Sequence, residues 1–256
     1  MMKKKRIQQL VDLLRKSNRL TSEESAAYFG VSLATIRRDF ETLMSLGMAR
    51  RFHGGICLSE GRNDPALPIA LRQSLDIAVK MRLAEAAARE LPEAGAVFID
   101  GGTTTACLAP FLDRPNLHVI TNSVALLKKF DQCSTTCASL TMTGGEFNRT
   151  SELLLGSETL HTLSTYHAEL AVISGTALDE DFIYDNREDA SDVQRCMANN
   201  SNRLVIIADS SKFGRKAMCK SLTTSRISLL ITDRSPEKYP IVEKLRQRGV
   251  RVQFVE

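Results

Sequence analysis

The spacing of hydrophobic residues changes along this chain and divides it into two parts. In the first part, apolar residues recur every three or four positions, as they do in amphipathic helices. Ile7, Leu10, Val11 and Leu14 share one face of a helix that is predicted over residues 4–16. This periodicity, together with the turn residues that follow, predicts a small helical domain at the start of the chain.

After Gly95 the pattern becomes one of short apolar runs that alternate with helical segments. The predicted strands are residues 96–100, 118–121, 140–143, 170–174, 204–208, 229–232 and 250–255. The predicted helices lie near residues 103–111, 123–131, 153–165, 189–201 and 236–248. Because strands and helices alternate, the second part is predicted to be an α/β domain whose mostly parallel sheet is covered on both faces.

Turn and capping residues predict a winged helix-turn-helix in the first part. Thr21 can cap a second helix, Gly30 allows a tight turn, and Ser32 can cap a third helix that ends at Gly47. A short basic hairpin is expected over residues 49–55. A recognition helix followed by a basic hairpin is the arrangement that lies in a DNA groove and contacts the backbone beside it.

The domain boundaries follow from composition. Residues 59–68 have the Gly, Pro, Asn and Asp content of a linker, and a helical stretch follows over about residues 69–91. We predict a DNA-binding domain over residues 1–58, a linker over 59–78, and an effector-binding and oligomerisation domain over 79–256.

The charge distribution indicates which domain meets a polyanion. The chain has 256 residues, 43% of them hydrophobic and 25% charged, which leaves room for two globular domains. Residues 1–58 contain 11 Lys/Arg and 5 Asp/Glu, a net charge of +6, whereas residues 59–256 contain 23 and 25, a net charge of −2. The excess positive charge lies in the first quarter, where a solvated basic tail at residues 3–6 is the alternative explanation.

Several other classes are disfavoured. No apolar run approaches the roughly 20 residues that cross a bilayer, and the N-terminus lacks the apolar core of a signal peptide, so no membrane partner is predicted. The six cysteines are scattered, without zinc-finger spacing. We therefore expect no metal, no other cofactor and no catalytic residue. The cysteines are expected to be ordinary residues of a reducing cytoplasm.

The candidate DNA contacts lie on the third helix and on the hairpin. Arginine can bind guanine through two hydrogen bonds, and Thr or Ala can contact a thymine methyl group. Arg37 or Arg38 can hold a phosphate instead, and the sequence leaves both roles open; the hairpin side chains are expected to contact phosphates. The predicted DNA-binding residues are Ser32, Ala34, Thr35, Arg37, Arg38, Arg50, Arg51 and His53.

The candidate effector site lies where the predicted strands end. Small residues and hydroxyls follow several strands, and in open α/β sheets these loops gather at one edge, where ligands bind. A helix opening after Asp100 would present N–H groups to an anion, Lys212 could pair with a phosphate, and Asp100 could accept from sugar hydroxyls. The alternative for any single loop is a tight turn or a helix cap. The predicted effector-binding residues are Asp100, Gly102, Thr103, Thr104, Thr105, Asn122, Ser123, Gly144, Gly145 and Lys212.

Motifs along nearly the whole chain carry a family resemblance. They are Val31–Ser32, Thr35–Asp39, Arg51–Gly55, Asp100–Thr105, Thr121–Ser123, Gly144–Gly145 and Asp209–Phe213. In these motifs the chain closely resembles the DeoR family of bacterial sugar-operon regulators. The resemblance implies a winged helix-turn-helix followed by an α/β domain similar to sugar-phosphate isomerases. It also implies a repressor of a carbohydrate-utilisation operon that a phosphorylated sugar or related metabolite releases from double-stranded operator DNA.

The chain departs from the family pattern at a few positions that are expected to border the pocket. Many relatives carry a lysine before Arg195, where this chain has Gln194, and Leu178 stands where a glycine is usual. An isomerase-like enzyme fused to a DNA-binding domain and an architectural DNA protein are the alternative functions. Paired half-sites on DNA would require a homo-oligomer, a dimer or a tetramer.

Overall fold

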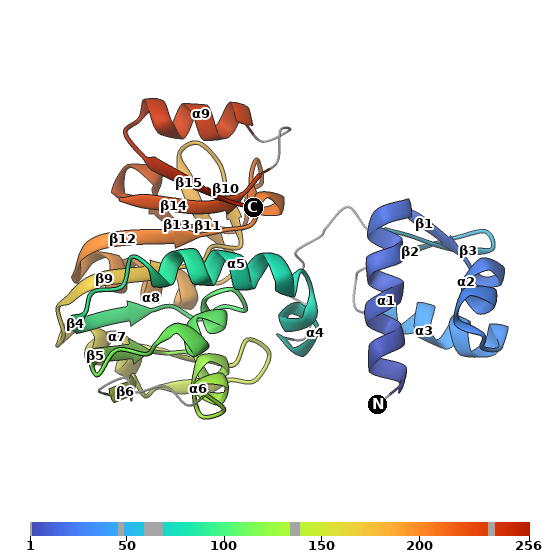
Figure 1. Ribbon diagram of the computed structural model, residues 1–256, viewed down its shortest axis with the longest axis horizontal. Coiled ribbons are helices and arrows are strands. Elements are labelled where there is room, and N and C mark those ends of the chain that lie inside the picture. Colours follow the sequence, from blue (N-terminus) through green and yellow to red (C-terminus); the bar gives the residue numbers. More distant parts are fainter. Residues whose placement is uncertain (1, 46–48, 59–68, 134–138, 235–238) are drawn as a thin grey trace. The chain divides into compact units, whose positions relative to one another are not determined.

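The protein consists of two compact units, Met1–Leu75 and Asp76–Glu256 (Figure 1). The computed structural model describes residues 2–45, 49–58, 69–133, 139–234 and 239–256. Each unit has its own cluster of buried apolar side chains. In the part of the chain that is described, no helix is long and apolar enough to cross a membrane.

The N-terminal unit combines helices with a small antiparallel sheet. Its helices are α1 (Met2–Ser17), α2 (Ser22–Phe29), α3 (Leu33–Ser45) and α4 (Ile69–Ser74). Its strands are β1 (Arg19–Thr21), β2 (Ala49–Phe52) and β3 (Gly55–Leu58), in the order β1-β3-β2. The predicted helices and basic hairpin are confirmed, and β1, which was not predicted, adds a third strand to the hairpin.

The predicted caps form as expected. Thr21 Oγ1 accepts a hydrogen bond from the Glu24 N–H at 3.2 Å, which caps α2, and donates to the Glu24 carboxylate at 2.7 Å. Gly30 adopts the left-handed conformation with φ 62°, and Ser32 Oγ accepts from the Thr35 N–H at 3.2 Å. Gly47 lies outside the described residues.

A buried ion pair joins the first and third helices. Asp39 is buried on the inner side of α3, and Arg6 of α1 donates to its carboxylate at 2.6 Å. The hairpin is fixed by close backbone packing, because a Cβ atom on Gly55 would lie 2.0 Å from the Leu20 carbonyl oxygen of β1. Only glycine fits at this position of the sheet.

The C-terminal unit is built on a parallel sheet of seven strands in the order β15-β14-β12-β9-β4-β5-β6. All seven predicted strands are present: β4 (Ala94–Ile99), β5 (Asn116–Thr121), β6 (Ser139–Met142), β9 (Ala168–Ile173), β12 (Ser201–Ile207), β14 (Leu229–Asp233) and β15 (Arg251–Val255). They were predictable because each central strand is buried on both faces and is therefore a nearly continuous apolar run.

Helices cover both faces of this sheet, and α5 lies across it in Figure 1. The helices are α5 (Ile77–Ala88), α6 (Val124–Phe130), α7 (Ser157–Ser164), α8 (Glu188–Asn199), α9 (Tyr239–Gln247), and the short 3-10 helices η1 (Thr105–Phe111), η2 (Ser210–Lys212) and η3 (Thr224–Arg226). Phe98 of β4 and Ile120 of β5 belong to the same core cluster as Val193 and Met197 of α8. Because side chains alternate between the two faces of a sheet, every second residue of β4 and β5, counted from Phe98 and Ile120, lies on the face that α8 covers.

Two predicted helices begin or break differently from expectation. The segment predicted as one helix over about residues 69–91 is interrupted at Asp76, which has a left-handed φ of 52°, and α5 begins after it. The segment predicted as a helix over residues 153–165 begins as strand β8 (Leu153–Leu155), and α7 starts only after Gly156, whose φ is 96°. In both places a positive φ stops the helical geometry.

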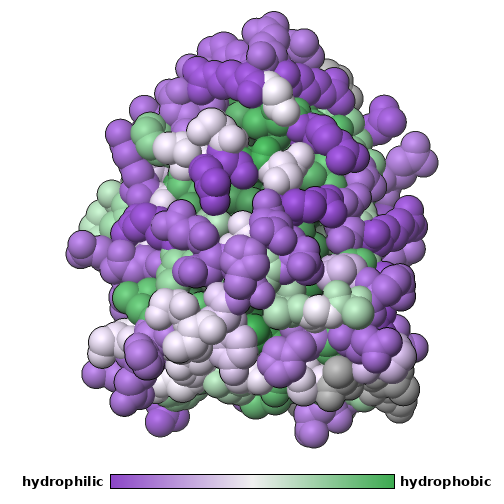
Figure 2. All heavy atoms as spheres, turned by 90° about the vertical axis from the view of Figure 1, so that its left-hand side faces the viewer, coloured by the Kyte–Doolittle hydropathy of each residue, from purple (hydrophilic) through white to green (hydrophobic). Residues whose placement is uncertain are grey.

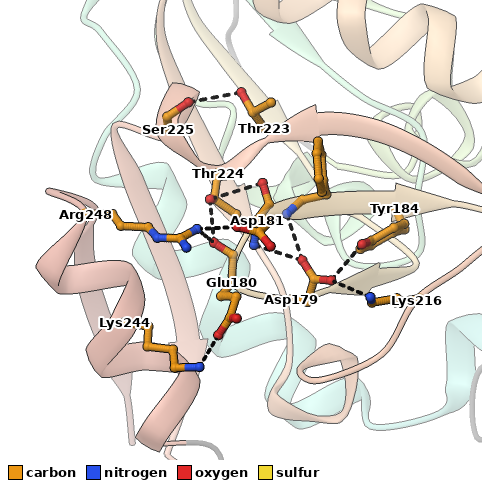
Figure 3. A network of polar contacts seen from close by, with 11 residues as sticks. Asp179, Glu180, Asp181, Tyr184, Lys216, Thr223, Thr224, Ser225, Lys244 and Arg248 are labelled. Carbon is orange, nitrogen blue, oxygen red and sulfur yellow. Dashed lines mark hydrogen bonds and ion pairs between the residues drawn. The ribbon is translucent and has the colours of Figure 1, made fainter.

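Five short strands in the described part of the C-terminal unit were not predicted. β7 (Glu146–Asn148) pairs with β8, and a separate sheet contains β10 (Ala177–Leu178), β11 (Phe182–Asp185) and β13 (Cys219–Thr223). The turn between β10 and β11 is held by a polar network (Figure 3). Asp179 accepts from the Tyr184 hydroxyl at 2.6 Å, and Arg248, which follows α9, donates to Asp181 at 2.6 Å. This network ties the small sheet to the C-terminal end of the chain.

The surface is mostly hydrophilic on the face drawn in Figure 2, where apolar atoms show only in patches between polar side chains. The large apolar side chains that are exposed among the described residues are Tyr28, Leu33, Ile77, Leu127, Phe147 and Met218. They come from different elements and are scattered in sequence, as is ordinary for a protein surface.

Candidate functional site

The recognition helix α3 presents one face to its own core and one to solvent. Ile36 and Phe40 are buried, whereas Ala34, Arg37 and Arg38 are exposed. This division matches the amphipathic pattern of the sequence. The exposed face carries the two arginines at the N-terminal half of the helix, where a recognition helix contacts base edges.

The hydroxyls of Ser32 and Thr35 are engaged at the start of this helix. Ser32 Oγ caps the Thr35 N–H, and the two side-chain oxygens lie 2.9 Å apart in a hydrogen bond. Both residues were predicted to contact DNA. Their hydroxyls orient the helix N-terminus, and the Thr35 methyl group remains the part suited to an apolar base contact.

A groove between α3 and the hairpin gathers several of the predicted phosphate contacts. It has a volume of about 480 Å³, and Arg37, Arg51 and His53 line it together with the acidic side chains of Glu23 and Glu41. Arg38 lies outside this groove. The structure therefore groups Arg37 with the hairpin and leaves Arg38 apart, a distinction that the sequence left open.

Phe52, at the end of β2, supports the hairpin from within the unit. The Arg19 guanidinium lies 5.6 Å from the centroid of the Phe52 ring, a cation–π contact between β1 and the hairpin. Arg50 and Arg51 are exposed on β2, opposite Cys57 and Ile56 of β3.

The second candidate site lies at the carboxyl edge of the parallel sheet. From β4 the chain proceeds through β5 to β6 in one direction, and from β9 it proceeds through β12, β14 and β15 in the other. The order of strands thus reverses between β4 and β9, which is the point where open α/β sheets bind ligands. Asp100 follows β4 and Ser174 follows β9, so both lie beside this point.

Asp100 is held in a dense set of neutral donors. Its N–H donates to the Val172 carbonyl at 2.9 Å, and its carboxylate accepts from the Gln194 side-chain amide at 3.2 Å. Burial, followed by the charge of Asp185, raises the pKa of the Asp100 carboxyl well above its ordinary range. Gly102 is required beside it, because a Cβ atom there would lie 2.3 Å from Ser174 Oγ.

Asn122 and Ser123 occupy the end of β5. Ser123 Oγ caps α6 by accepting from the Leu126 N–H at 3.1 Å. The Asn122 amide donates to the Leu154 carbonyl at 3.1 Å, while its Oδ1 atom is buried and has no hydrogen-bond partner. Of the two predicted residues at the end of β5, Asn122 is thus the one whose side chain has an unused acceptor atom.

The remaining predicted residues have mainly structural contacts. Thr105 Oγ1 donates to the Gly102 carbonyl at 3.1 Å, and Gly144 and Gly145 have φ values of 72° and 106° in the turn after β6. A Cβ atom on Gly145 would lie 2.3 Å from Thr159 Oγ1 of α7. These glycines are packed against α7, two strands away from β4.

The helix that was predicted to open at Thr103 is a 3-10 helix that begins at Thr105 and contains Pro110. Thr104 is buried at the cap position, but its side chain makes no capping hydrogen bond. Because this helix is short and irregular, its dipole is a weaker anion attractor than the predicted α-helix would be.

Two lysines from distant elements lie at the same edge. Lys80 of α5 is buried, and burial together with the positive charge of Lys212 lowers its pKa from 10.5 to about 8, while the charge of Asp209 acts in the opposite direction. Lys212 ends η2, directly after β12. Lys80 was missed by the sequence analysis, because it lies within a regular helix and nothing nearby marks it as special.

In the described part of the chain, no three His, Cys, Asp or Glu side chains are placed to hold a metal ion. The carboxyl edge of the sheet offers two kinds of polar group, a pair of lysines and a set of oxygen acceptors. An arrangement of this kind can bind an anionic group at one end of a small molecule and donor groups at the other.

These two sites define a class of protein, a DNA-binding regulator with a ligand-sensing domain, and comparisons with known proteins identify the family. Residues 6–61 match a DeoR-like helix-turn-helix domain, and residues 76–234 match the DeoR C terminal sensor domain. The chain belongs to the DeoR family of transcriptional regulators.

Curated relatives align over nearly the whole chain. The putative aga operon transcriptional repressor of Escherichia coli O157:H7 is 29% identical, over 98% of this chain and 93% of the relative. The glycerol-3-phosphate regulon repressor of Haemophilus influenzae is 30% identical, over 91% and 90%. Among solved structures, ribose 5-phosphate isomerase A from Methanocaldococcus jannaschii is 15% identical over 54% of this chain and 55% of that one, with a TM-score of 0.40, which supports no argument about activity.

Proposed function

We propose that this regulator is the repressor of a carbohydrate-utilisation operon and that a phosphorylated sugar releases it from its operator. The observation that carries this proposal is the placement of Lys80 and Lys212 at the same sheet edge as Asp100, beside the point where the strand order reverses. A phosphate is the anion that two neighbouring lysines suit, and the acceptors nearby suit the rest of a sugar.

The DNA contacts divide by position. Arg38 and Ala34, one helical turn apart on the exposed face of α3, read base edges in the major groove. Arg37, Arg51 and His53 hold phosphates along the groove between α3 and the hairpin. Arg50, which is also exposed on the hairpin, adds a further phosphate contact.

In the sensor domain, Lys80 and Lys212 bind the effector phosphate, and we name this pair the anion end of the site. Asp100, Asn122 and the Gly101–Gly102 loop contact the remainder of the ligand. Effector and DNA favour different arrangements of the oligomer, so each weakens the binding of the other.

The test is operator binding with and without effector. Sites are selected from random DNA with the full-length protein, and binding to the best site is titrated against a panel of hexose and pentose phosphates. Coupling of about 1–3 kcal/mol predicts that a saturating effector weakens binding roughly 5–150-fold. Lys80→Ala and Lys212→Ala should retain DNA binding and lose this response.

Lys220→Ala is the matched control, because Lys220 lies 4.3 Å over the Phe182 ring in the small sheet, on an element that does not contribute to the anion end. If an effector is found and both variants of the anion end respond to it with wild-type affinity, the phosphate does not bind at Lys80 and Lys212.

A further inference from the structure

Two buried carboxylates share one neutral donor at the carboxyl edge of the sheet. The Gln194 side-chain nitrogen donates to Asp100 Oδ2 at 3.2 Å and to Asp185 Oδ2 at 3.3 Å. The two carboxylate oxygens are therefore no farther apart than these two distances together. The Gln194 carbonyl oxygen accepts from the Ser221 hydroxyl, which fixes the orientation of the amide.

Among the described residues, the hydrogen bonds to these two carboxylates come from neutral groups. Asp100 is contacted by the N–H groups of Gly101 and Ser174 and by Gln194, and Asp185 by backbone N–H groups, the Thr176 hydroxyl and Gln194. The Arg187 guanidinium donates to Asp189 at 2.9 Å, and it interacts with Asp185 through charge without a hydrogen bond. Two buried negative charges held by neutral donors alone are costly, and their pKa values are raised accordingly.

A third acceptor faces the same side of the sheet. Asp100 and Asn122 directly follow the register pair Ile99 and Thr121 of β4 and β5. Because Phe98 and Ile120 point into the core beneath α8, the alternation of strand side chains directs Asp100 and Asn122 to that side as well. The Asn122 Oδ1 atom is buried without a partner, so it is available to a donor from a ligand.

We define the oxygens of Asp100, Asp185 and Asn122 as the acceptor end of the site. The half-buried Ser174 adjoins it, because its N–H donates to the Asp100 carboxylate. The site is thus bipolar, with lysines at the anion end and carboxylates at the acceptor end. A protonated primary amine has three N–H donors and one positive charge, which matches three acceptors and a pair of carboxylates that only neutral groups hydrogen-bond.

We propose that the acceptor end binds a protonated primary amine of the effector, so that this regulator responds to an aminated sugar phosphate. The inference rests on the proposed function, since it specifies the second functional group of the same ligand. A hydroxyl at this position would donate one hydrogen bond and bring no positive charge to the carboxylates. Gln194 makes this selectivity possible, because an amide orients both carboxylates without neutralising them.

The experiment compares matched ligands on the full-length protein by isothermal titration calorimetry at pH 7. The probes are glucose, galactose and mannose 6-phosphates and their 2-amino-2-deoxy counterparts, together with the N-acetylated forms, which keep the nitrogen but lose its charge. We expect at least one amine to bind about tenfold or more tightly than its hydroxyl and N-acetyl counterparts, as a charged hydrogen bond in place of a neutral one implies.

Three variants test the assignment. Asp185→Asn removes one charge with little change of shape, and Gln194→Lys supplies an ammonium group from the protein itself. Both should abolish the preference for the amine over its hydroxyl counterpart. Asp189→Asn is the control, because this carboxylate lies four residues from Asp185 but pairs with Arg187, and it should leave the preference unchanged.

The outcomes separate this inference from the function on which it rests. If hydroxyl sugar phosphates bind as tightly as the amines, and Asp185→Asn and Gln194→Lys do not alter the ratio, the inference is wrong while the proposed function stands. If no sugar phosphate of any kind binds, both are wrong. Circular dichroism of each variant shows whether it is folded. If Gln194→Lys is unfolded, Asp185→Asn alone tests the inference.

Discussion

At the scale of single residues, the paired carboxylates Asp100 and Asp185 link the candidate site to stability. Their pKa values are raised by burial, so the native protein binds protons there more tightly than the unfolded chain. The stabilisation from these protons is present below the ordinary pKa of aspartate and is lost as the pH rises through the native pKa values. At neutral pH the pair therefore destabilises the fold.

We expect Asp185→Asn to raise the free energy of unfolding at pH 7 by on the order of 1 kcal/mol, and to change it little near pH 4. Urea unfolding followed by circular dichroism at both pH values measures this. Asp189→Asn should have no stabilising effect at pH 7, because hydrogen bonds from Arg187 lower the pKa of Asp189 despite its partial burial. A loss of stability in Asp185→Asn at pH 7 would contradict the account of the pair.

The protonation of Lys80 provides a second prediction at the scale of single residues. With a pKa of about 8, its side chain is about half protonated at pH 8 and fully protonated at pH 6. A phosphate bound beside it would raise this pKa, so effector binding at pH 8 should take up a fraction of a proton. Calorimetry in two buffers of different ionisation enthalpy measures the uptake, which should vanish in Lys80→Gln and persist in Lys220→Gln.

At the scale of elements, α3 and the hairpin are expected to contribute differently to DNA binding. Arg37→Ala and Arg51→Ala should each reduce the slope of log affinity against log salt by about 0.9 and leave the selected site unchanged, because both side chains line the groove assigned to phosphates. Arg38→Ala should cost about 1–3 kcal/mol at the selected site and relax its sequence preference. Fluorescence anisotropy on selected and random DNA measures both quantities; an equal loss on the two DNAs for Arg38→Ala would assign it to phosphate instead.

At the scale of the whole molecule, the C-terminal unit is expected to fold and assemble without the DNA-binding unit. It contains the complete seven-stranded sheet and a core of its own, and one winged helix covers too little DNA for selective binding. A fragment of residues 76–256 should be a dimer or tetramer in analytical ultracentrifugation. A monomer at micromolar concentration would show that assembly depends on the N-terminal unit or on DNA.

The sequence by itself determined those helices and strands in which buried apolar residues recur in a regular pattern within the element. The α3 helix follows from Ile36, Phe40 and Leu43 together with the Ser32 cap, and the strands β9 and β12 follow from apolar runs that are buried on both faces. These signals are visible within one element, because side-chain periodicity records which face is covered. The basic hairpin and the Asp100 loop were located from the types of residue that follow a helix and a strand.

Only the tertiary structure decided which residues meet. Lys80 and Asp185 come from α5 and β11, and each is an ordinary polar residue within its own segment, whereas only the family resemblance marked Gln194 of α8. The strand order brings them to one edge, and no local pattern encodes that order. The break at Asp76 and the short strands β10, β11 and β13 were likewise unpredictable, because their conformations depend on neighbours far along the chain rather than on periodicity.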